Sequence, residues 1–223
     1  MKEMKKVSNI VLSALIFFIA IYSYGCKESV SDPNIDPNIV TIGKQVWMTK
    51  NLDVVTFRNG DTIPEAKTDD EWRRAGIEKQ PAWCYYENNT ENIQKYGRLY
   101  NWYAVKDPRR IEPVGFRIPN DAEWTQMIEF LGGRDSAGTR LKSITGWKYN
   151  GNGNDISKFS AFPGGWRSST GAFYDIEYRG AFWTSTFFND NNAKYWSMHY
   201  DSTSVNDSYT YNGDGLSIRC IRD

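Results

Sequence analysis

Residues 115–131, GFRIPNDAEWTQMIEFL, combine a helix start signal with the spacing of an amphipathic helix. Asn120 and Glu123 have the spacing of a capping box, in which each side chain bonds the other residue's backbone amide. The apolar residues that follow are spaced i, i+3, i+4 and i+7 and form one stripe: Trp124, Met127, Ile128 and Leu131. Gly132 and Gly133 are typical of a helix end. We therefore predict a helix that starts after Asn120 and packs this stripe against a core.

Two further helices are predicted on either side of this one. Upstream, Thr68 precedes Asp69, Asp70 and Glu71 in capping-box spacing, which predicts a short helix that stops near Gly76. The three acids are interpreted as partners of the helix dipole rather than as paired hydrolytic carboxylates. Downstream, a second segment with helical spacing closes at Gly146, with its apolar positions at Ala137, Leu141 and Ile144.

Strand signals lie at the start and at the end of the same region. Residues 40–42 and 46–48 alternate on either side of Gly43-Lys44, a pattern that predicts a β-hairpin with a two-residue turn. Two later runs alternate as strands do: Trp196, Met198 and Tyr200, then Leu216, Ile218 and Cys220. Helices in the first half and short strands with long loops in the second predict the α+β class.

The N-terminus has the layout of a bacterial lipoprotein signal. Lys2, Lys5 and Lys6 precede an apolar stretch over residues 10–21, and Gly25-Cys26 follows. We predict a lipoprotein signal peptide at residues 1–25 and lipidation of Cys26, which would attach the chain to a membrane. Cleavage by ordinary signal peptidase is the alternative. This places the protein in the bacterial cell envelope, in the outer membrane and on the cell surface.

Residues 26–39 are polar and contain Asp-Pro-Asn-Ile twice, at 32–35 and 36–39. Each Asp is biased toward extended geometry by the Pro that follows it, so we predict a flexible tether. The remaining residues, 40–223, are long enough for one sizeable domain with its own core. We expect it to be a monomer.

Composition excludes a nucleic-acid binder and favours an aromatic surface. The chain has 27 basic and 27 acidic residues, and no basic run lies beyond the signal, so nucleic acid is not an expected partner. It also has 9 Trp and 14 Tyr, side chains that stack on planar or sugar rings when they are exposed. Core packing of the same rings is the alternative.

Three cysteines fit an oxidising compartment. With Cys26 assigned to the lipid, Cys84 and Cys220 remain as a candidate disulfide, which would close a long loop and stabilise the fold by roughly 4–5 kcal/mol on the chain-entropy model. Two buried free thiols are the alternative, because a sequence does not show whether two cysteines meet.

Six segments occur in an order that resembles one family. They are TIGKQVWM (41–48), PAWCYY (81–86), YGRLYNWYAV (96–105), GFRIPNDAEW (115–124), FPGGWR (162–167) and LSIRCIRD (216–223). Together they resemble the Fibrobacter succinogenes major paralogous domain, a family of secreted and lipid-anchored bacterial proteins. The resemblance covers nearly all of the chain after the tether and implies the fold more than a reaction.

The segment at 117–124 also resembles the helix entry of formylglycine-generating-enzyme-like domains, and residues 183–186 with 217–220 resemble the C-type-lectin-like fold. This implies a small twisted antiparallel sheet flanked by helices, with long loops. In the formylglycine-generating enzymes a closely spaced cysteine pair near the C-terminus performs the oxidation. This chain has only Cys220 there, so that chemistry is not expected.

No other catalytic or cofactor pattern is present in the sequence. The single histidine, His199, lies in an alternating run and is interpreted as a sheet residue rather than a general base. No phosphate loop, dinucleotide fingerprint or zinc spacing occurs, so we expect no catalytic residues, no metal and no cofactor. Residues 150–155, NGNGND, place oxygen side chains at alternate positions as calcium loops do, but a plain Asn/Gly turn is the favoured interpretation.

The C-terminal loops mix amide groups with aromatic rings, a mixture suited to sugar or peptide recognition. The candidate ligand-binding residues are Trp183, Asn189, Asp190, Asn192, Tyr195, Trp196, Tyr209, Tyr211 and Asn212. A solvated hairpin connection with core rings on either side is the alternative.

We therefore expect a non-catalytic binding module that recognises a glycan or an envelope or extracellular protein through these loops. The alternative is a structural or assembly component of the envelope that takes no small ligand. An enzyme related to the formylglycine-generating-enzyme-like domains is the third hypothesis.

Overall fold

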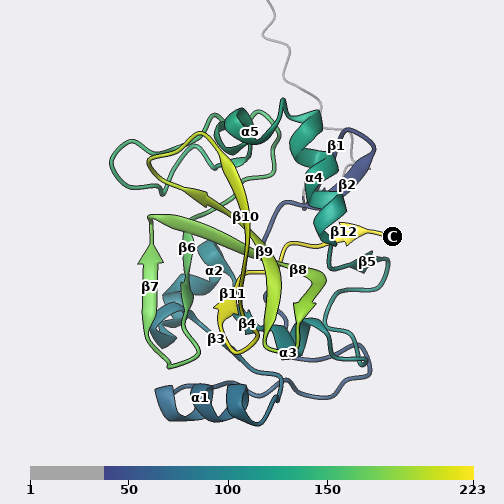
Figure 1. The fold of residues 1–223 in the computed structure, drawn as a ribbon, viewed down its shortest axis with the longest axis vertical. Coiled ribbons are helices and arrows are strands. Elements are labelled where there is room, and N and C mark those ends of the chain that lie inside the picture. Colours follow the sequence, from purple (N-terminus) through teal and green to yellow (C-terminus); the bar gives the residue numbers. More distant parts are fainter. Residues whose placement is uncertain (1–37) are drawn as a thin grey trace, which may run out of the picture. The chain divides into compact units, whose positions relative to one another are not determined.

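The structure is a computed structural model that describes residues 38–223. The predicted signal peptide, Cys26 and nearly all of the predicted tether lie outside the described residues. The described residues form an α+β fold, which is the predicted class, and they contain two sheets and several short helices (Figure 1). Within residues 38–223 the helices are all too short or too polar to cross a membrane.

The smaller sheet joins the two ends of the described region. Its strand order is β1-β2-β12-β5, with β1 at Ile39–Ile42, β2 at Gln45–Met48, β12 at Ile221–Arg222 and β5 at Phe116–Arg117. The predicted hairpin is confirmed: Ile42 pairs with Gln45 across a two-residue turn, and Gly43 has a φ of 62°. Ile221 pairs with both Trp47 and Arg117, so the last strand lies between β2 and β5.

The larger sheet has the order β10-β9-β8-β6-β11-β4-β3, and β7 pairs with β6. All pairs are antiparallel except β6 with β8. The strands are β3 (Trp83–Cys84), β4 (Leu99–Asn101), β6 (Gly164–Arg167), β7 (Phe173–Ile176), β8 (Arg179–Asn189), β9 (Asn192–His199), β10 (Val205–Tyr211) and β11 (Gly215–Leu216).

The helices are α1 (Asp69–Ile77), α2 (Ile93–Tyr96), α3 (Trp102–Val105), α4 (Asp121–Phe130) and α5 (Arg134–Leu141), with 3-10 turns at Tyr86–Asn88 and Thr90–Asn92. Both predicted capping boxes are present: Thr68 with Glu71 begins α1, and Asn120 with Glu123 begins α4. Glu123 also forms a salt bridge with Arg117, so one side chain joins β5 to the start of α4.

The third predicted helix is shorter than expected. α5 ends at Leu141, and Lys142 has an extended ψ of 137°. The chain continues as a bridge in which the Ser143 amide donates to the Ala161 carbonyl, and Ile144 is exposed. The helical spacing of Ile144 was therefore coincidental, because pairing with residue 161 draws the chain out of the helix.

The stripe of α4 packs into an aromatic core. Trp124 lies 5.2 Å from Trp47, 5.6 Å from both Phe159 and Phe182, and 6.4 Å from Trp196, measured between ring centroids. These rings come from both sheets and from the loop before β6, and all five are fully buried. The helix thus fastens the smaller sheet to the larger one (Figure 1).

The run at Leu216, Ile218 and Cys220 was predicted as a single strand, and the structure divides it between the two sheets. β11 ends at Leu216 in the larger sheet and β12 begins at Ile221 in the smaller one. Residues 217–220 cross between them, and the carbonyls of Ile218 and Cys220 accept from the amides of Leu52 and Met48. The apolar residues alternate because the crossing segment is buried, not because it stays in one sheet.

The predicted disulfide is wrong. Cys84 and Cys220 are both free and buried, and they belong to different core clusters. Cys84 lies on β3 beneath α1, whereas Cys220 lies on the segment that crosses between the sheets. Burial raises the pKa of the Cys84 thiol to about 12 and also raises the pKa of Cys220. Both therefore behave as small apolar side chains in the core.

Candidate ligand-binding cleft

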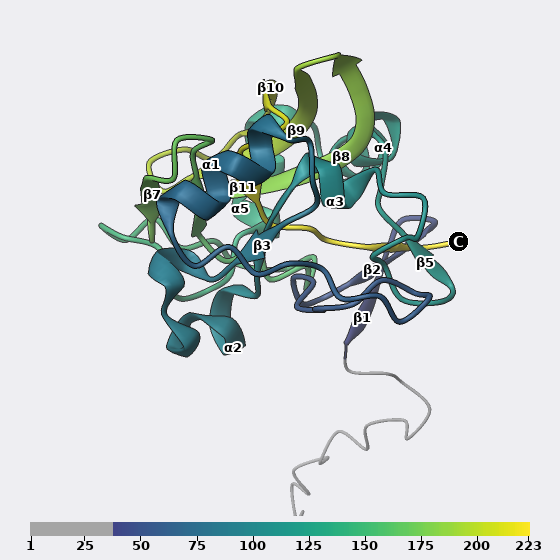
Figure 2. The ribbon, with the colours of Figure 1, turned by 90° about the horizontal axis from the view of Figure 1, so that it is seen from below.

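A cleft of about 370 Å³ lies where α1 meets the turns of the C-terminal strands. We call it the α1 cleft. Seen from below, α1 covers the larger sheet near β11 and β3 (Figure 2). The lining comes from five separate segments of the chain: Arg73, Gly76, Ile77, Tyr103, Ser169, Thr170, Asn191, Tyr211, Asn212 and Gly213.

Two glycines create the close approach at the base of the α1 cleft. A Cβ atom added to Gly76 would lie 3.5 Å from the Gly213 Cα, and one added to Gly213 would lie 3.4 Å from the Gly76 Cα. The end of α1 and the turn after β10 thus touch through backbone alone. Larger side chains here would push the two walls apart or fill part of the cleft.

The turn after β10 is fixed by hydrogen bonds to its neighbours. The Asn212 amide donates to the Asn191 carbonyl at 2.8 Å, and its Nδ2 donates to the Asp190 carbonyl at 3.0 Å. Its carbonyl in turn accepts from the Trp102 amide at 2.9 Å, at the start of α3. The turn between β8 and β9, the turn after β10 and α3 are therefore held together at Asn212.

Asn212 also carries a buried acceptor without a partner. Its Oδ1 is inaccessible and receives no hydrogen bond from the described residues. Burying an amide oxygen without a donor costs about 1–3 kcal/mol.

Asp214 connects the loop at 168–170 to the turn after β10. Its Oδ1 accepts from the Ser169 amide at 2.6 Å, and its Oδ2 accepts from the Thr210 hydroxyl. Burial raises the pKa of Asp214, while these hydrogen bonds act in the other direction. The loop at 168–170 is thereby bound to the same turn that carries Tyr211 and Asn212, so the polar wall of the cleft is built as one unit.

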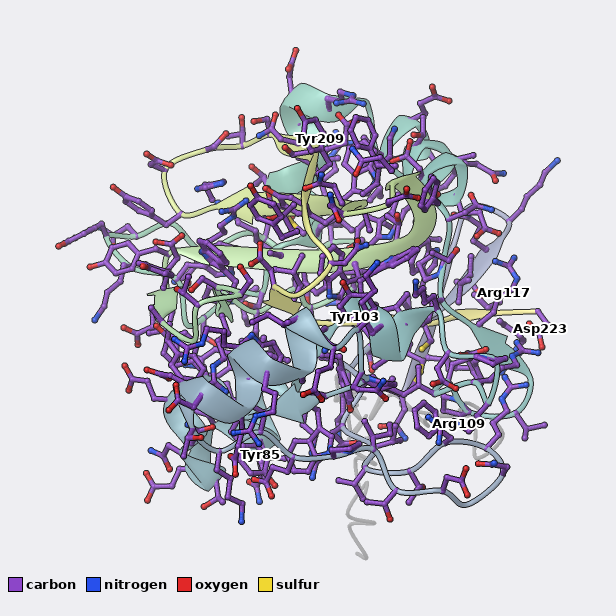
Figure 3. The ribbon with its side chains drawn as sticks, turned by 60° about the horizontal axis from the view of Figure 1, so that its bottom comes forward. Tyr85, Tyr103, Arg109, Arg117, Tyr209 and Asp223 are labelled. Atoms are coloured by element: carbon purple, nitrogen blue, oxygen red, sulfur yellow. The ribbon has the colours of Figure 1, made fainter. Side chains whose placement is uncertain are left out.

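The lining combines apolar and polar groups in a way that suits binding. Tyr211 is 62% exposed and Ile77 is 74% exposed, whereas Tyr103 is buried in the wall beside the end of α1 (Figure 3). The polar groups are the guanidinium of Arg73, the amide of Asn191, and the hydroxyls of Ser169 and Thr170. No carboxylate, imidazole or thiol occurs among the described residues that line it.

Exposed aromatic rings continue from the α1 cleft along β10. Tyr209 lies two residues before Tyr211 on this edge strand, and its ring stacks on Phe188 at 4.2 Å with an angle of 8° between the planes. Tyr209 is 55% exposed and lies well apart from Tyr103 of α3 (Figure 3). Residues two apart on a strand share a face. Tyr209 and Tyr211 therefore present their rings on one side of β10.

The structure divides the predicted ligand-binding residues into three groups. Tyr211 and Asn212 line the α1 cleft, and Tyr209 lies two residues before Tyr211 on β10, outside the lining. Asn189, Asp190 and Asn192 form the turn between β8 and β9, where Asn189 Oδ1 accepts from the amides of residues 191 and 192. The third group lies in the core: Trp183, Tyr195 and Trp196.

The core position of the two tryptophans corrects the sequence prediction. Trp183 and Trp196 are fully buried, and their indole nitrogens donate to the Tyr100 carbonyl and to Asp121 Oδ1. Tyr195 is 8% exposed and its hydroxyl accepts from Arg179. Rings that are enclosed by other side chains offer no face to a ligand, so these three residues support the sheet behind the cleft.

Sequence reasoning missed the half of the cleft that comes from the first part of the chain and from the loop after β6. Arg73, Ile77 and Tyr103 were not singled out, and neither were Ser169 and Thr170. Ile77 carried a usable signal, because it is a large apolar residue at the end of a helix whose mean composition is polar. Nothing in the local sequence links it to Tyr211.

The oxygen side chains of the loop at 150–155 bond the chain itself. Asn152 Oδ1 accepts from the Trp147 amide, and Asn154 Oδ1 accepts from the Ile156 amide. Asp155 accepts from the amide and the hydroxyl of Ser160. Across residues 38–223, no group of three or more His, Cys, Asp or Glu side chains is arranged to hold a metal ion. Calcium binding here stays a hypothesis.

Comparison with protein-family models gives one match. The model of the Fibrobacter succinogenes major domain matches residues 40–222. The chain belongs to the Fibrobacter succinogenes major domain family. The match begins at the first strand and ends in β12, so both sheets, the helices and the α1 cleft all lie within the family domain. No curated protein and no solved structure matches the chain.

Proposed function

We propose that this Fibrobacter succinogenes major domain protein is a non-catalytic binding module that recognises a glycan in the α1 cleft. The observation that best supports glycan binding is the exposed ring of Tyr211 in a cleft lined by amide, hydroxyl and guanidinium groups. An aromatic face packs against the C–H face of a sugar ring, and neutral polar groups bond its hydroxyls. The volume of about 370 Å³ suits one or two sugar rings.

The lining supports binding rather than catalysis. General acid–base or nucleophilic chemistry needs a carboxylate, imidazole, thiol or activated hydroxyl with a base beside it. The described residues that line the α1 cleft supply none of the first three groups. His199, the chain's single histidine, ends β9 and is not among them. Asp69 begins α1 and pairs with Arg167, which agrees with a structural role for the acids there.

We also propose a cellular location and a fold type for this protein. The basic and apolar segments before Cys26 support a lipid-anchored envelope protein that lies in the outer membrane and is exposed on the cell surface. We also propose that the protein acts as a monomer. The mostly antiparallel larger sheet, the flanking helices and the long segment without regular structure between α5 and β6 support a C-type-lectin-like arrangement. In that arrangement the loops carry the binding residues.

The direct test is a binding screen of the full-length chain in detergent against a glycan array and isolated envelope polysaccharides. We expect saturable binding of a saccharide by the wild type. Tyr211→Ala should weaken it by roughly tenfold or more, because a central aromatic contact carries a large share of binding energy. The fold should be unaffected, since the Tyr211 ring is exposed.

Tyr149→Ala is the matched control, because Tyr149 is 75% exposed and lies outside the α1 cleft. This variant should bind as the wild type does. Equal losses in both variants would remove the cleft from the proposal. If the wild type binds no saccharide and instead co-purifies with envelope proteins, the assembly role replaces glycan recognition.

A further inference from the structure

A second pocket, of about 460 Å³, lies beside the segment that follows β2. We call it the Arg219 pocket. It is lined by residues of this segment, of α2 and of two further loops: Thr49, Lys50, Asn51, Asp53, Ile93, Gln94, Lys95, Gly97, Phe162 and Arg219. It shares no lining residue with the α1 cleft.

Arg219 brings a buried positive charge to this pocket. Arg219 is 1% exposed, and all the acceptors of its side-chain nitrogens are neutral oxygens. Nε and Nη2 both donate to Asn51 Oδ1, at 3.1 and 2.8 Å. Nη1 donates to the carbonyls of Met48 and Phe159, and Nη2 reaches the Ser160 carbonyl at 3.4 Å. The guanidinium also lies over the rings of Phe159 and Phe182.

The charge of Arg219 has no carboxylate in direct contact. Among residues 38–223, no Asp or Glu oxygen lies within salt-bridge distance of its guanidinium. The nearest link is indirect, because Asp155 bonds the amide and hydroxyl of Ser160, whose carbonyl faces Arg219. Burial lowers the pKa of Arg219 to about 9. An unpaired buried cation is costly, so an anion brought close to it would be favoured.

Two lysines add positive charge at the mouth of the pocket. Lys50 and Lys95 are exposed, and neither forms a salt bridge with a described residue. Lys95 Nζ lies 4.7 Å from the centre of the Tyr96 ring. Asp53 is the one carboxylate among the described lining residues. The lining therefore has a clear excess of positive charge, in a chain whose formal net charge is zero.

The backbone is closely packed on the side of the pocket that Gly97 lines. Gly97 has a φ of 71°, and a Cβ added there would lie 3.0 Å from both the Leu52 carbonyl oxygen and the Asn51 Cβ. Asn51, which holds Arg219 through Oδ1, donates through Nδ2 to the Tyr96 carbonyl at 2.8 Å. Asn51 therefore joins the segment after β2 to the end of α2 and at the same time holds the guanidinium of Arg219.

We propose that the Arg219 pocket binds a small oxyanion, a sulfate group or a sugar carboxylate. Lys50 and Lys95 contact the oxyanion directly, and the buried guanidinium supplies a fixed positive field beneath it. Gln94 provides a neutral donor at the wall. Sulfate and carboxylate share this chemistry and differ in shape, so two probes distinguish them. The site is independent of glycan binding in the α1 cleft.

The test is thermal unfolding of the full-length chain in detergent, followed by circular dichroism, with sodium sulfate and with sodium glucuronate. Sodium chloride at matched ionic strength controls for screening. We expect at least one of the two anions to raise the melting temperature saturably above the chloride control. A shift by sulfate alone assigns a tetrahedral oxyanion, and a shift by glucuronate alone assigns a carboxylate.

The double variant Lys50→Gln/Lys95→Gln should lose this shift and weaken apparent binding by roughly tenfold or more. Lys44→Gln/Lys79→Gln removes the same charge from exposed positions outside the pocket and should keep it. The proposal is overturned if neither anion exceeds chloride, if both double variants lose the shift equally, or if both keep it, as the general stabilisation of folded proteins by sulfate would. Tyr211→Ala should keep the anion effect, so failure of one site is distinguishable from failure of the other.

Discussion

Among the single residues, His199 at the end of β9 has a pKa that its surroundings lower. It pairs with Arg179 in the sheet and is half-buried. Burial is the largest cause of the lowered pKa, and the positive charges of Arg179 and Lys142 lower it further. Asp201 and Asp175 oppose them. The neutral imidazole is therefore the form that this site favours.

We predict an NMR titration midpoint for His199 below the ordinary value of about 6.5. Because the folded pKa is lower than the unfolded one, the unfolded state binds the proton more readily. Stability should be complete above about pH 6.5 and should fall as the pH drops from there toward the folded pKa. The chain has one histidine, so its ring signals need no further assignment.

His199→Gln is the control for the stability measurement. It should remove the part of the acid-induced loss that lies between about pH 6.5 and the folded pKa. A midpoint at or above 6.5, or an unchanged loss in the variant, would contradict the burial argument.

At the scale of elements, Arg167 connects β6 to the start of α1. Its side chain is fully buried, with Nε donating to the Gly171 carbonyl at 2.9 Å and Nη1 donating to the Ala66 carbonyl at 2.8 Å. Nη2 donates to Asp69 Oδ1 at 3.0 Å. The guanidinium also packs over the ring of Trp72, which α1 buries against the sheet. The position of α1, and hence one wall of the α1 cleft, depends on this residue.

Arg167→Met should lower the free energy of unfolding by about 2–4 kcal/mol, because two buried carbonyls lose their donor. Asp69→Asn should cost about 1 kcal/mol or less, because the Asp69 side chain is 70% exposed and water replaces the pair. Urea unfolding of both variants measures the difference. Similar losses in the two would mean that the ion pair, rather than the carbonyl contacts, holds α1 in place.

At the scale of the whole molecule, the two sheets share one aromatic core, and Trp196 lies within it. Its ring stacks on Trp124 of α4, and its indole nitrogen donates to Asp121 at the start of that helix. Arg134 lies over the same ring at 4.7 Å. Trp196 therefore belongs to the framework that positions the C-terminal turns.

Trp196→Ala should destabilise the protein by about 3–5 kcal/mol through the cavity it leaves. Tyr211→Ala should change stability by about 0.5 kcal/mol or less, as expected for an exposed ring. Chemical denaturation of the two variants in parallel checks this contrast. A small effect of Trp196→Ala would mean that its ring is not packed in the core and would return it to the candidate binding residues.

Local elements of this fold were predictable where the signal lies within a few residues of the chain. The capping boxes at Thr68 and Asn120 and the turn at Gly43-Lys44 are such signals, and all three are present in the structure. Ile144 shows the limit, because a helical spacing was overridden by pairing between residues 142 and 161. The crossing at 217–220 shows the same limit for strands.

Capping, turn geometry and motif order depend on neighbouring residues, so the family, the α+β class, the first hairpin and the starts of α1 and α4 follow from the amino-acid order alone. Packing between distant segments places Trp183 and Trp196 in the core, keeps Cys84 and Cys220 in separate clusters, and brings Ile77 and Tyr211 to the same cleft. Each of these depends on which distant segments pack together. A tryptophan or a cysteine has the same local pattern whether its neighbours in space enclose it or leave it exposed.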